Sequence, residues 1–156
     1  MEKTGQSEIA VHEWSGLVKD KTVLEVGCGK APFSMGISGI SKKVIAIDVA
    51  NHLIEKNNHG GKKIQFIRMD AKSMGFGKGV FDIIVFYDAL AHVKKNIIEI
   101  MQECFRVLTE TGVILFISTW KLDCPLHKII FEACRGKIIE DRKGDGFRVT
   151  MVRNER

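Results

Sequence analysis

The sequence predicts a single-domain α/β fold, an open, doubly wound sheet that is mostly parallel and carries an antiparallel hairpin strand at its C-terminal end. Three observations predict it. Short apolar runs of strand length alternate with helical segments along most of the chain. A turn with glycines at Gly27 and Gly29 follows the first run. Acidic residues stand at or just after the ends of the first four runs, at the sheet edge where such folds bind ligands.

Size and composition limit the classes of protein to consider. A chain of 156 residues with 45% hydrophobic residues can bury one core, so residues 1–156 are expected to form one domain, with an N-terminal helix in 1–20 and a core over 21–156. The net charge of +5 comes from scattered basic residues and is weak evidence for a nucleic-acid partner. No apolar run is long enough for a bilayer and no signal peptide is evident, so we expect a soluble, cytoplasmic protein with no membrane association.

The cysteines show neither a CxxC pair nor a regular spacing. They are Cys28, Cys104, Cys124 and Cys134. We expect reduced thiols rather than a disulfide framework. The nearest approach to a metal pattern adds His127 to the last two cysteines, but it lacks a fourth ligand, so no metal is expected.

The first part of the chain predicts a helix, a strand and a glycine turn. Residues 7–17 place apolar side chains near the helical period, and a strand over 22–26 follows. Pro32 can open a helix over 32–40, because the first helical position has no intrahelical acceptor for its N–H. Glycines let the backbone approach a ligand, and a helix start favours negative or strongly polar groups. Residues 23–33 therefore predict the mouth of a nucleotide-type pocket.

The next segments repeat the pattern of strand and helix. Residues 44–47 form a second apolar run, and a short helix over 51–58 is ended by glycines at 60 and 61. A third strand is expected over 63–69. The run at 81–86 is continuously apolar, as in strands buried on both faces of a parallel sheet.

The last part of the chain predicts the fifth strand and a closing hairpin. Apolar residues recur with helical spacing over 89–108, and Thr111-Gly112 turns the chain into a strand over 113–118. A helix over 125–135 follows. Residues 137–140 and 147–152 form two strand-like runs joined by a loop with an Asp-Gly pair, which favours a tight reversal. This makes seven strands in all.

An acidic side chain stands at or just after the end of each of the first four strands. They are Glu25, Asp48, Asp70 and Asp88. Carboxylates in a cleft cost free energy unless they are partnered, so this row favours a ligand with hydroxyls, an amine or a cation. His92, four residues after Asp88, would share its helix face if residues 89–93 are helical, and it is the first candidate for a catalytic base; the alternative is a solvent-exposed histidine without a catalytic role. Asp88 and His12 are the next candidates. Trp14 and Trp120 either line a substrate pocket or pack in the core.

These segments together resemble the class I S-adenosylmethionine-dependent methyltransferases, as a small methyltransferase-type-11-like core. The matching segments keep the family's order: VLEVGCGKAPF, VIAIDVA, FIRMDAKSM, FDIIVFYDALAHV and IIEIMQECFRVLTETGVILFIS. The resemblance implies a Rossmann-like fold whose seventh strand is reversed. It also implies transfer of the sulfonium methyl group of S-adenosylmethionine to an acceptor by in-line displacement, leaving S-adenosylhomocysteine. The acceptor, a small molecule or a macromolecule, is not identified by these residues.

The resemblance also implies roles for single residues. Gly27 and Gly29 would let the loop pass under the methionine portion of the cofactor, and Glu25 would help to place its amino group. Asp48 would take the two ribose hydroxyls. Asp70 and Ala71 would flank the adenine, and Tyr87 would lie beside the methionine portion. The expected cofactor-binding residues are Glu25, Gly27, Cys28, Gly29, Asp48, Val49, Asp70, Ala71 and Tyr87, with Cys28 filling space and offering a backbone N–H.

Some features depart from the family's pattern. Ala31 followed by Pro32 stands where the family usually has a third glycine, and alanine fits there if the backbone does not need positive φ. The segment YDAL after the fourth strand disfavours methyltransferases that act on nucleic-acid bases. Because the chain has few additions that could bind a substrate, a homodimer or a partner subunit that completes the pocket stays open.

Two other functions remain as alternatives. The first is a non-catalytic binding or scaffolding subunit with the same fold. The second, less favoured, is an NAD-dependent oxidoreductase, since the loop nearly matches GxGxxG and Asp48 falls where a ribose-binding acid belongs. Pro32 occupies the sixth position of that motif, where Gly or Ala is required.

Overall fold

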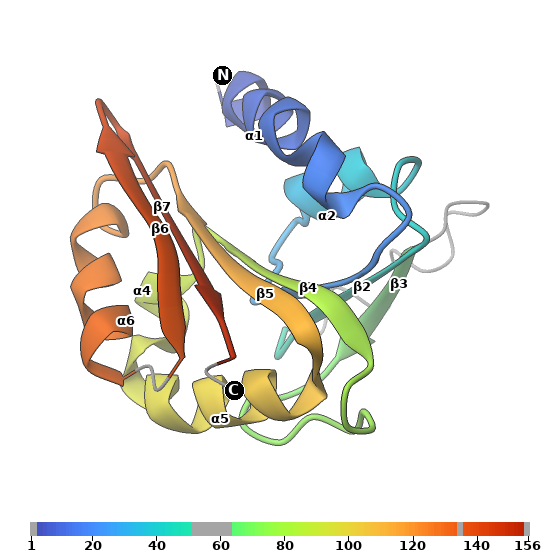
Figure 1. Cartoon of the computed structure of the whole chain (residues 1–156). Helices are drawn as coiled ribbons and strands as arrows, with labels where there is room; N and C mark the ends of the chain where they lie inside the picture. Colours follow the sequence, from blue (N-terminus) through green and yellow to red (C-terminus); the bar gives the residue numbers. More distant parts are fainter. Residues whose placement is uncertain (1–2, 51–63, 134–135, 155–156) are drawn as a thin grey trace.

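The protein is built on one seven-stranded sheet with helices on both faces (Figure 1). The computed structural model describes residues 3–50, 64–133 and 136–154. The strands are β1 (Thr22–Val26), β2 (Lys43–Asp48), β3 (Ile64–Arg68), β4 (Phe81–Tyr87), β5 (Leu108–Ser118), β6 (Lys137–Gly144) and β7 (Phe147–Arg153). Their order across the sheet is β3-β2-β1-β4-β5-β7-β6, and β7 runs antiparallel to both of its neighbours. The predicted seven-stranded, mostly parallel sheet with an antiparallel hairpin strand is confirmed.

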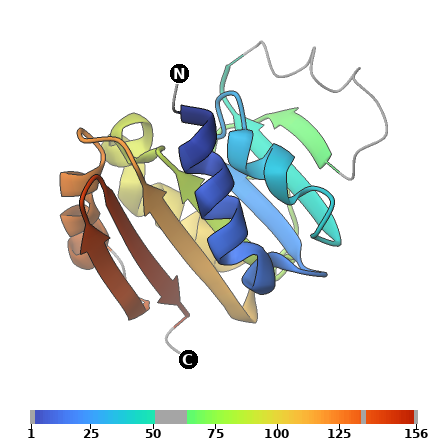
Figure 2. The ribbon, with the colours of Figure 1, turned by 90° about the horizontal axis from the view of Figure 1, so that it is seen from above.

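The helices lie in two layers, one on each face of the sheet. They are α1 (Lys3–Val18), α2 (Pro32–Ile37), α4 (Leu90–Val93), the 3₁₀ helix η1 (Lys94–Asn96), α5 (Ile97–Val107), the 3₁₀ helix η2 (Cys124–His127) and α6 (Lys128–Ala133). Helices α1 and α2 cover one face, and α4, α5 and α6 cover the other (Figures 1 and 2). Within the described residues, no helix is long and apolar enough to cross a membrane.

Each face of the sheet carries its own apolar core. In β4, Ile83 and Val85 pack with the core under α1 and α2, whereas Ile84 and Phe86 pack with the core under α5. Phe86 stacks on Phe116 of β5 with ring centroids 4.7 Å apart. Because side chains alternate between faces, a strand covered on both sides must be apolar at every position, which is why β4 reads as one continuous apolar run.

Several boundaries differ from those predicted. The helix predicted over 32–40 ends at Ile37. The helix predicted over 89–108 is divided into α4, η1 and α5, because the backbone of Asn96 leaves the helical region (φ −120°, ψ 28°). The helix predicted over 125–135 begins as η2, and β6 continues to Gly144. The helix predicted over 51–58 and Cys134 lie outside the described residues.

The turn predicted at Thr111-Gly112 lies inside β5. The strand already begins at Leu108, which pairs with Phe81, and the register shifts before the next pair. A Cβ on Gly112 would lie 2.6 Å from Leu108 Cδ1 and 2.8 Å from the carbonyl oxygen of Asp82. Glycine therefore permits a close approach at this irregularity, and the strand continues through it.

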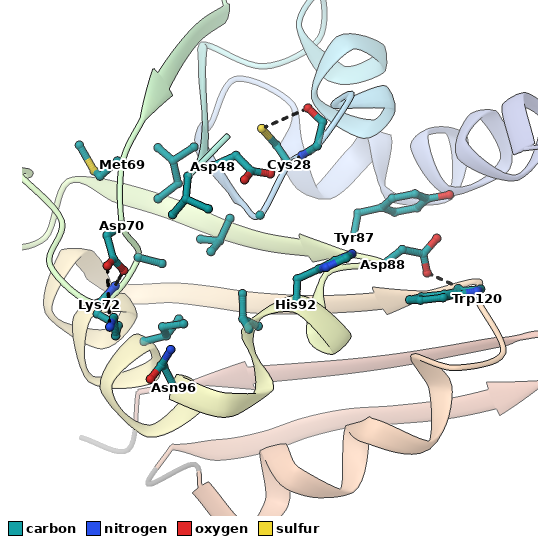
Figure 3. Close-up of a pocket in the computed structure, with 18 of the residues that line it drawn as sticks. Cys28, Asp48, Met69, Asp70, Lys72, Tyr87, Asp88, His92, Asn96 and Trp120 are labelled. Carbon is teal, nitrogen blue, oxygen red and sulfur yellow. Dashed lines mark hydrogen bonds and ion pairs between the residues drawn. The ribbon is translucent and has the colours of Figure 1, made fainter. Parts of the chain in front are cut away.

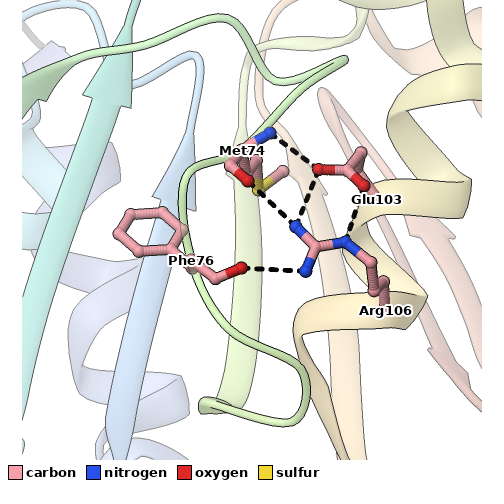
Figure 4. Close-up of polar contacts among 4 residues, drawn as sticks. All are labelled: Met74, Phe76, Glu103 and Arg106. Atoms are coloured by element: carbon pink, nitrogen blue, oxygen red, sulfur yellow. Dashed lines mark hydrogen bonds and ion pairs between the residues drawn. The ribbon is translucent and has the colours of Figure 1, made fainter.

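An ion pair on α5 holds the loop that follows β3 (Figure 4). Arg106 donates to Glu103 and to the carbonyl oxygens of Phe76 (2.8 Å) and Met74 (2.9 Å). Glu103 accepts the N–H of Met74 at 2.7 Å, and its hydrogen bond from Arg106 lowers its pKa. These bonds tie the loop after Asp70 to a helix that packs on the sheet.

Candidate functional site

A cavity of about 880 Å³, called here the main cavity, opens at the carboxyl ends of the parallel strands (Figure 3). It lies where the strand order reverses between β1 and β4, the position at which doubly wound sheets bind ligands. The predicted residues that line it are Gly27, Cys28, Gly29, Asp48, Val49, Asp70, Ala71, Tyr87, Asp88 and His92. Glu25 and His12 are not among the lining residues.

The glycine turn after β1 forms the floor of the main cavity. Gly27 and Gly29 have φ of 66° and 54°, the left-handed region that favours glycine. A Cβ on Gly27 would lie 3.1 Å from the Cβ of Ala89, so the turn packs directly on the segment after β4. The N–H of Cys28 is donated to Ile47 O (3.1 Å), which corrects the expectation that it is offered to a ligand.

Ala31 also adopts the left-handed conformation, with φ 56° and ψ 45°. The condition stated for alanine, that the backbone does not need positive φ, is therefore not met at this position. This conformation costs an alanine roughly 1–2 kcal/mol. Its methyl group is fully buried with Cys28, Ala46 and Phe66, and this packing offsets part of the cost. The loop thus keeps the shape that a third glycine would allow.

Asp48 connects the glycine turn to the main cavity. It is the last residue of β2 and is half-buried. Its Oδ2 accepts the N–H of Gly29 at 2.8 Å and its Oδ1 accepts the N–H of Ala50 at 3.2 Å. A carboxylate oxygen can accept two hydrogen bonds, so each oxygen keeps capacity for a ligand hydroxyl.

The wall after β3 combines one acid with apolar side chains. Asp70 is exposed; its Oδ1 accepts the N–H of Lys72 at 2.9 Å, and its Oδ2 lies 3.9 Å from Lys72 Nζ. Apolar side chains line the cavity beside it: Val49, Met69, Ala71 and Ile100. This wall suits a flat, weakly polar ring with an N–H group at its edge.

Glu25 lies behind the glycine turn, outside the cavity wall. It is fully buried, and its Oε1 accepts the backbone N–H (3.1 Å) and the hydroxyl (2.5 Å) of Ser34. The predicted contact with a ligand amino group does not fit this placement. Side chains of β1 alternate between faces, and this position points under α2, so the carboxylate anchors the start of that helix.

We expect Glu25→Ala to destabilise the fold by roughly 2–4 kcal/mol, because the buried donors of Ser34 lose their acceptor. Urea unfolding measures this loss. Ser34→Ala is the matched control: it removes only the hydroxyl and should cost roughly 1 kcal/mol. Unchanged stability of the Glu25 variant, with loss of ligand binding, would instead show that Glu25 contacts the ligand.

Asp88 lines the end of the main cavity that lies next to β5, away from the Asp70 wall. Its Oδ1 accepts the N–H groups of Thr119 (2.6 Å) and Trp120 (3.1 Å), and its Oδ2 accepts the Thr119 hydroxyl (2.6 Å). Asp88 itself has φ 48°. Both oxygens of Asp88 thus accept hydrogen bonds from the segment after β5. This predicted base therefore has a structural role, fixing that segment to the end of β4.

His92 and Trp120 form an aromatic pair at the same end. His92 is exposed on α4, and its ring lies 6.4 Å from the Trp120 ring with an angle of 18° between the planes (Figure 3). The predicted shared helix face with Asp88 is not formed, because α4 begins only at Leu90. His92 remains the candidate base of the cavity. His12 is exposed on α1, away from the lining residues.

Tyr87 completes this end. Its ring stacks on Phe33 with centroids 5.8 Å apart, and burial, with the charges of Asp88 and Glu25 as smaller causes, raises its pKa. The phenol therefore stays protonated and can donate a hydrogen bond.

The residues after β5 were not predicted as a group. Thr119 and Trp120 line the main cavity, as do Gln6 of α1 and Asn96 of η1. Trp14, by contrast, is buried in the core under α1. The available signal was positional: Thr119 directly follows the fifth parallel strand, whose carboxyl end meets the same edge as the first four.

Comparison with protein families matches residues 24–116 to a family described as "Methyltransferase domain". A curated relative is the demethylmenaquinone methyltransferase of Lactococcus lactis subsp. lactis (strain IL1403), 28% identical over 119 residues. The aligned part is 71% of this chain and 47% of that protein, so the chain spans about half the length of this relative.

Solved structures share the fold at low sequence identity. A SAM-dependent methyltransferase from Aquifex aeolicus is 19% identical with a TM-score of 0.77, covering 93% of this chain and 88% of that one. The N-methyltransferase NodS from Bradyrhizobium japonicum WM9, in complex with S-adenosyl-L-homocysteine, is 17% identical with a TM-score of 0.74, covering 97% and 87%. These likenesses show a common fold.

Proposed function

The chain belongs to the methyltransferase domain family, and on that premise we propose that it transfers the methyl group of S-adenosylmethionine to an acceptor bound in the main cavity. The observation that carries this proposal is Asp48. Its carboxylate stands at the end of β2, faces the cavity and keeps hydrogen-bonding capacity for two neighbouring hydroxyls. The two hydroxyls of a ribose fit this arrangement.

The other residues that line the main cavity fit the same cofactor. The apolar wall with Asp70 at its edge suits an adenine, whose exocyclic amine would donate to that carboxylate. Ala71 and Val49 would pack on the ring, and the turn at Gly27 would pass under the methionine portion. S-adenosylmethionine, when bound, supplies an electrophilic methyl group on a positively charged sulfur.

The glycine turn supports this cofactor over a dinucleotide. A pyrophosphate is held by backbone N–H groups that point at the ligand. Here the N–H groups of Cys28 and Gly29 are donated to Ile47 O and to Asp48. The turn is bound to β2 and leaves these two donors unavailable for a phosphate.

The acceptor would enter beside Trp120 and His92. The exposed, nearly parallel rings offer a flat surface, which favours a planar acceptor. The name of the Lactococcus relative gives demethylmenaquinone as its acceptor. Because a quinone ring system is planar, we carry quinones over as the first acceptor class to test.

The catalytic work of the chain is mainly positioning. Holding an acceptor lone pair in line with the methyl group and excluding water supply most of the acceleration. For a hydroxyl acceptor, His92 would take the proton, since Asp88 is committed to Thr119 and Trp120.

A thermal-shift titration tests the cofactor. At a hundred times its dissociation constant, S-adenosylmethionine or S-adenosylhomocysteine should stabilise the fold by roughly 2.7 kcal/mol. NAD should give no shift, because the turn offers no pyrophosphate site. A shift with NAD alone would favour the oxidoreductase, and no shift with any of the three would favour a scaffold.

A further inference from the structure

A chain of hydrogen-bonded polar side chains is buried behind the acceptor end of the main cavity. Its members, called here the buried relay, are Asp123, Ser118, His127, Thr150 and Asp141. Asp123 Oδ2 contacts Ser118 Oγ, and His127 Nε2 lies 2.8 Å from the same oxygen. His127 Nδ1 lies 2.8 Å from Thr150 Oγ1, which lies 3.1 Å from Asp141 Oδ1. The first four members are at most 1% exposed.

The buried relay joins the C-terminal hairpin to the cavity wall. Thr150 and Asp141 belong to β7 and β6. At the other end, Asp123 Oδ1 accepts the N–H of Ala91, the neighbour of His92, at 2.7 Å. Ser118 ends β5 and directly precedes Thr119 and Trp120. Both sides of the aromatic pair are therefore attached to this relay.

The direction of each hydrogen bond follows from the Asp141 end. Arg148 donates to both oxygens of Asp141 (3.1 and 3.0 Å), and this hydrogen bonding lowers the pKa of Asp141. Asp141 is thus a carboxylate and can only accept. The Thr150 hydroxyl has one proton and gives it to Asp141, so His127 Nδ1 must donate to Thr150.

The protons of His127 and Ser118 determine which atom donates at Asp123. Burial, together with the nearby charge of Arg148, lowers the pKa of His127 to about 4, so at neutral pH its ring carries one proton. That proton is on Nδ1, and Nε2 accepts from Ser118. If Ser118 Oγ donated to Asp123 Oδ2, His127 would need a second proton, on Nε2, to make its contact with Ser118. On a singly protonated ring Nε2 accepts the proton of Ser118, and Asp123 Oδ2 is then the donor to Ser118 Oγ. Burial raises the pKa of Asp123 in the same sense.

We propose that Asp123 is a protonated carboxylic acid at neutral pH and that the buried relay is a positioning device for the acceptor end of the main cavity. Ser118, His127 and Asp123 are the residue types of a hydrolase triad, but Ser118 is 1% exposed and no substrate can reach it. The members are positioning residues. Only the positioning part rests on the proposed methyl transfer.

Nitrogen-15 NMR of the histidine rings tests the protonation of the wild-type chain. The expected result for His127 at pH 7 is a neutral ring with its proton on Nδ1. A proton on Nε2 would show that the bonds run the other way. A doubly protonated ring would place the proton on His127 in place of Asp123. Either result overturns the proposal.

A pair of matched substitutions tests the acid independently. Asp123→Asn keeps both contacts, because the amide oxygen can accept from Ala91 and the amide nitrogen can donate to Ser118. Its melting temperature should equal that of the wild type. Asp88→Asn is the control, since both oxygens of Asp88 accept hydrogen bonds and its melting temperature should fall. An equal fall for both variants would show that Asp123 is ionised.

The pH dependence of stability follows from the two shifted groups. A raised carboxyl pKa means that stability is lost as pH rises from about 3.9 to the folded-state value. The lowered pKa of His127 gives the opposite change between about 4 and 6.5, so the two offset each other there. If Asp123 is protonated at neutral pH, as proposed, its loss of stability continues above that range, where His127 no longer changes its protonation. The charged and titratable groups that act on these two pKa values are Asp88 and His92 for Asp123, and Arg148 and Asp141 for His127.

Trp120 fluorescence distinguishes an effect of the buried relay on the position of Trp120 from an effect on the stability of the whole fold. In a Trp14→Phe background, Trp120 emission should change above neutral pH, and Asp123→Asn should remove the change. Constant Trp120 emission in the Trp14→Phe variant that retains Asp123, while its stability falls with pH, would contradict the positioning role. Because these measurements use no cofactor, they do not depend on methyl transfer; failure of the proposed function would appear separately, as a missing thermal shift with S-adenosylmethionine.

Discussion

Asp48→Ala is expected to weaken binding of S-adenosylmethionine by at least 100-fold. A hydrogen bond to a charged group contributes about 1.5–3 kcal/mol, and two ribose hydroxyls would lose such a partner. Their sum, roughly 3–6 kcal/mol, corresponds to about 10²–10⁴ in the dissociation constant. The variant also leaves the N–H groups of Gly29 and Ala50 without their acceptor, which loosens the glycine turn. Isothermal titration calorimetry with S-adenosylhomocysteine measures the loss.

Asp70→Ala is the matched control for this experiment. Its carboxylate also lines the main cavity, but it is exposed and already paired with Lys72, so the loss should stay below about 10-fold. A urea melt of each variant checks that the fold is intact. Full turnover by the Asp48 variant would contradict the proposed binding of S-adenosylmethionine in the main cavity, since no other described carboxylate replaces Asp48 at the end of β2.

His92→Ala is expected to lower turnover by roughly 10²–10⁴ when the acceptor must lose a proton, the range for a general base. Binding of S-adenosylhomocysteine should be unchanged, because His92 stands on α4 beside Trp120, away from Asp48 and Asp70 (Figure 3). The assay is release of S-adenosylhomocysteine with an acceptor that the wild-type protein methylates, and a naphthoquinol is the first to try.

Two controls distinguish proton transfer from packing. His92→Phe keeps a flat ring against Trp120 but cannot accept a proton, and it should be as slow as the alanine variant. His12→Ala changes a histidine that does not line the cavity and should turn over normally. If His92→Phe is fully active, the ring stacks on the acceptor and takes no proton.

Local sequence patterns predicted the sheet and most of its cavity. Apolar runs separated by helical segments require parallel strands, and the carboxyl ends of such strands converge on one edge. Gly27, Gly29, Asp48 and Asp70 lie at or within three residues of those ends, so their positions along the chain were enough to bring them together. The prediction works because each of these residues is placed by the strand that immediately precedes it.

The roles of Glu25 and Asp88 needed the tertiary structure. Glu25 lies one residue before the end of β1 and Asp88 directly follows β4, and the sequence pattern does not distinguish them from Asp48 at the end of β2. Glu25 is turned under α2 to Ser34, and Asp88 is held by Thr119, 31 residues away. Which side of a strand a carboxylate points to, and which donors reach it, depends on the elements packed against it.

By itself, the sequence determined the fold and the position of the cavity at the strand ends, and it suggested the nucleoside-like ligand that is proposed here, because these depend on periodicity and on residues next to one another. Only the tertiary structure decided that Ala31 keeps the left-handed turn, that His92 meets Trp120 and that the buried relay exists. The relay takes its members from β5, β6, β7, η2 and the loop before η2. A hydrogen bond between distant segments forms only when their packing brings donor and acceptor within about 3 Å of each other, and no local pattern encodes that distance.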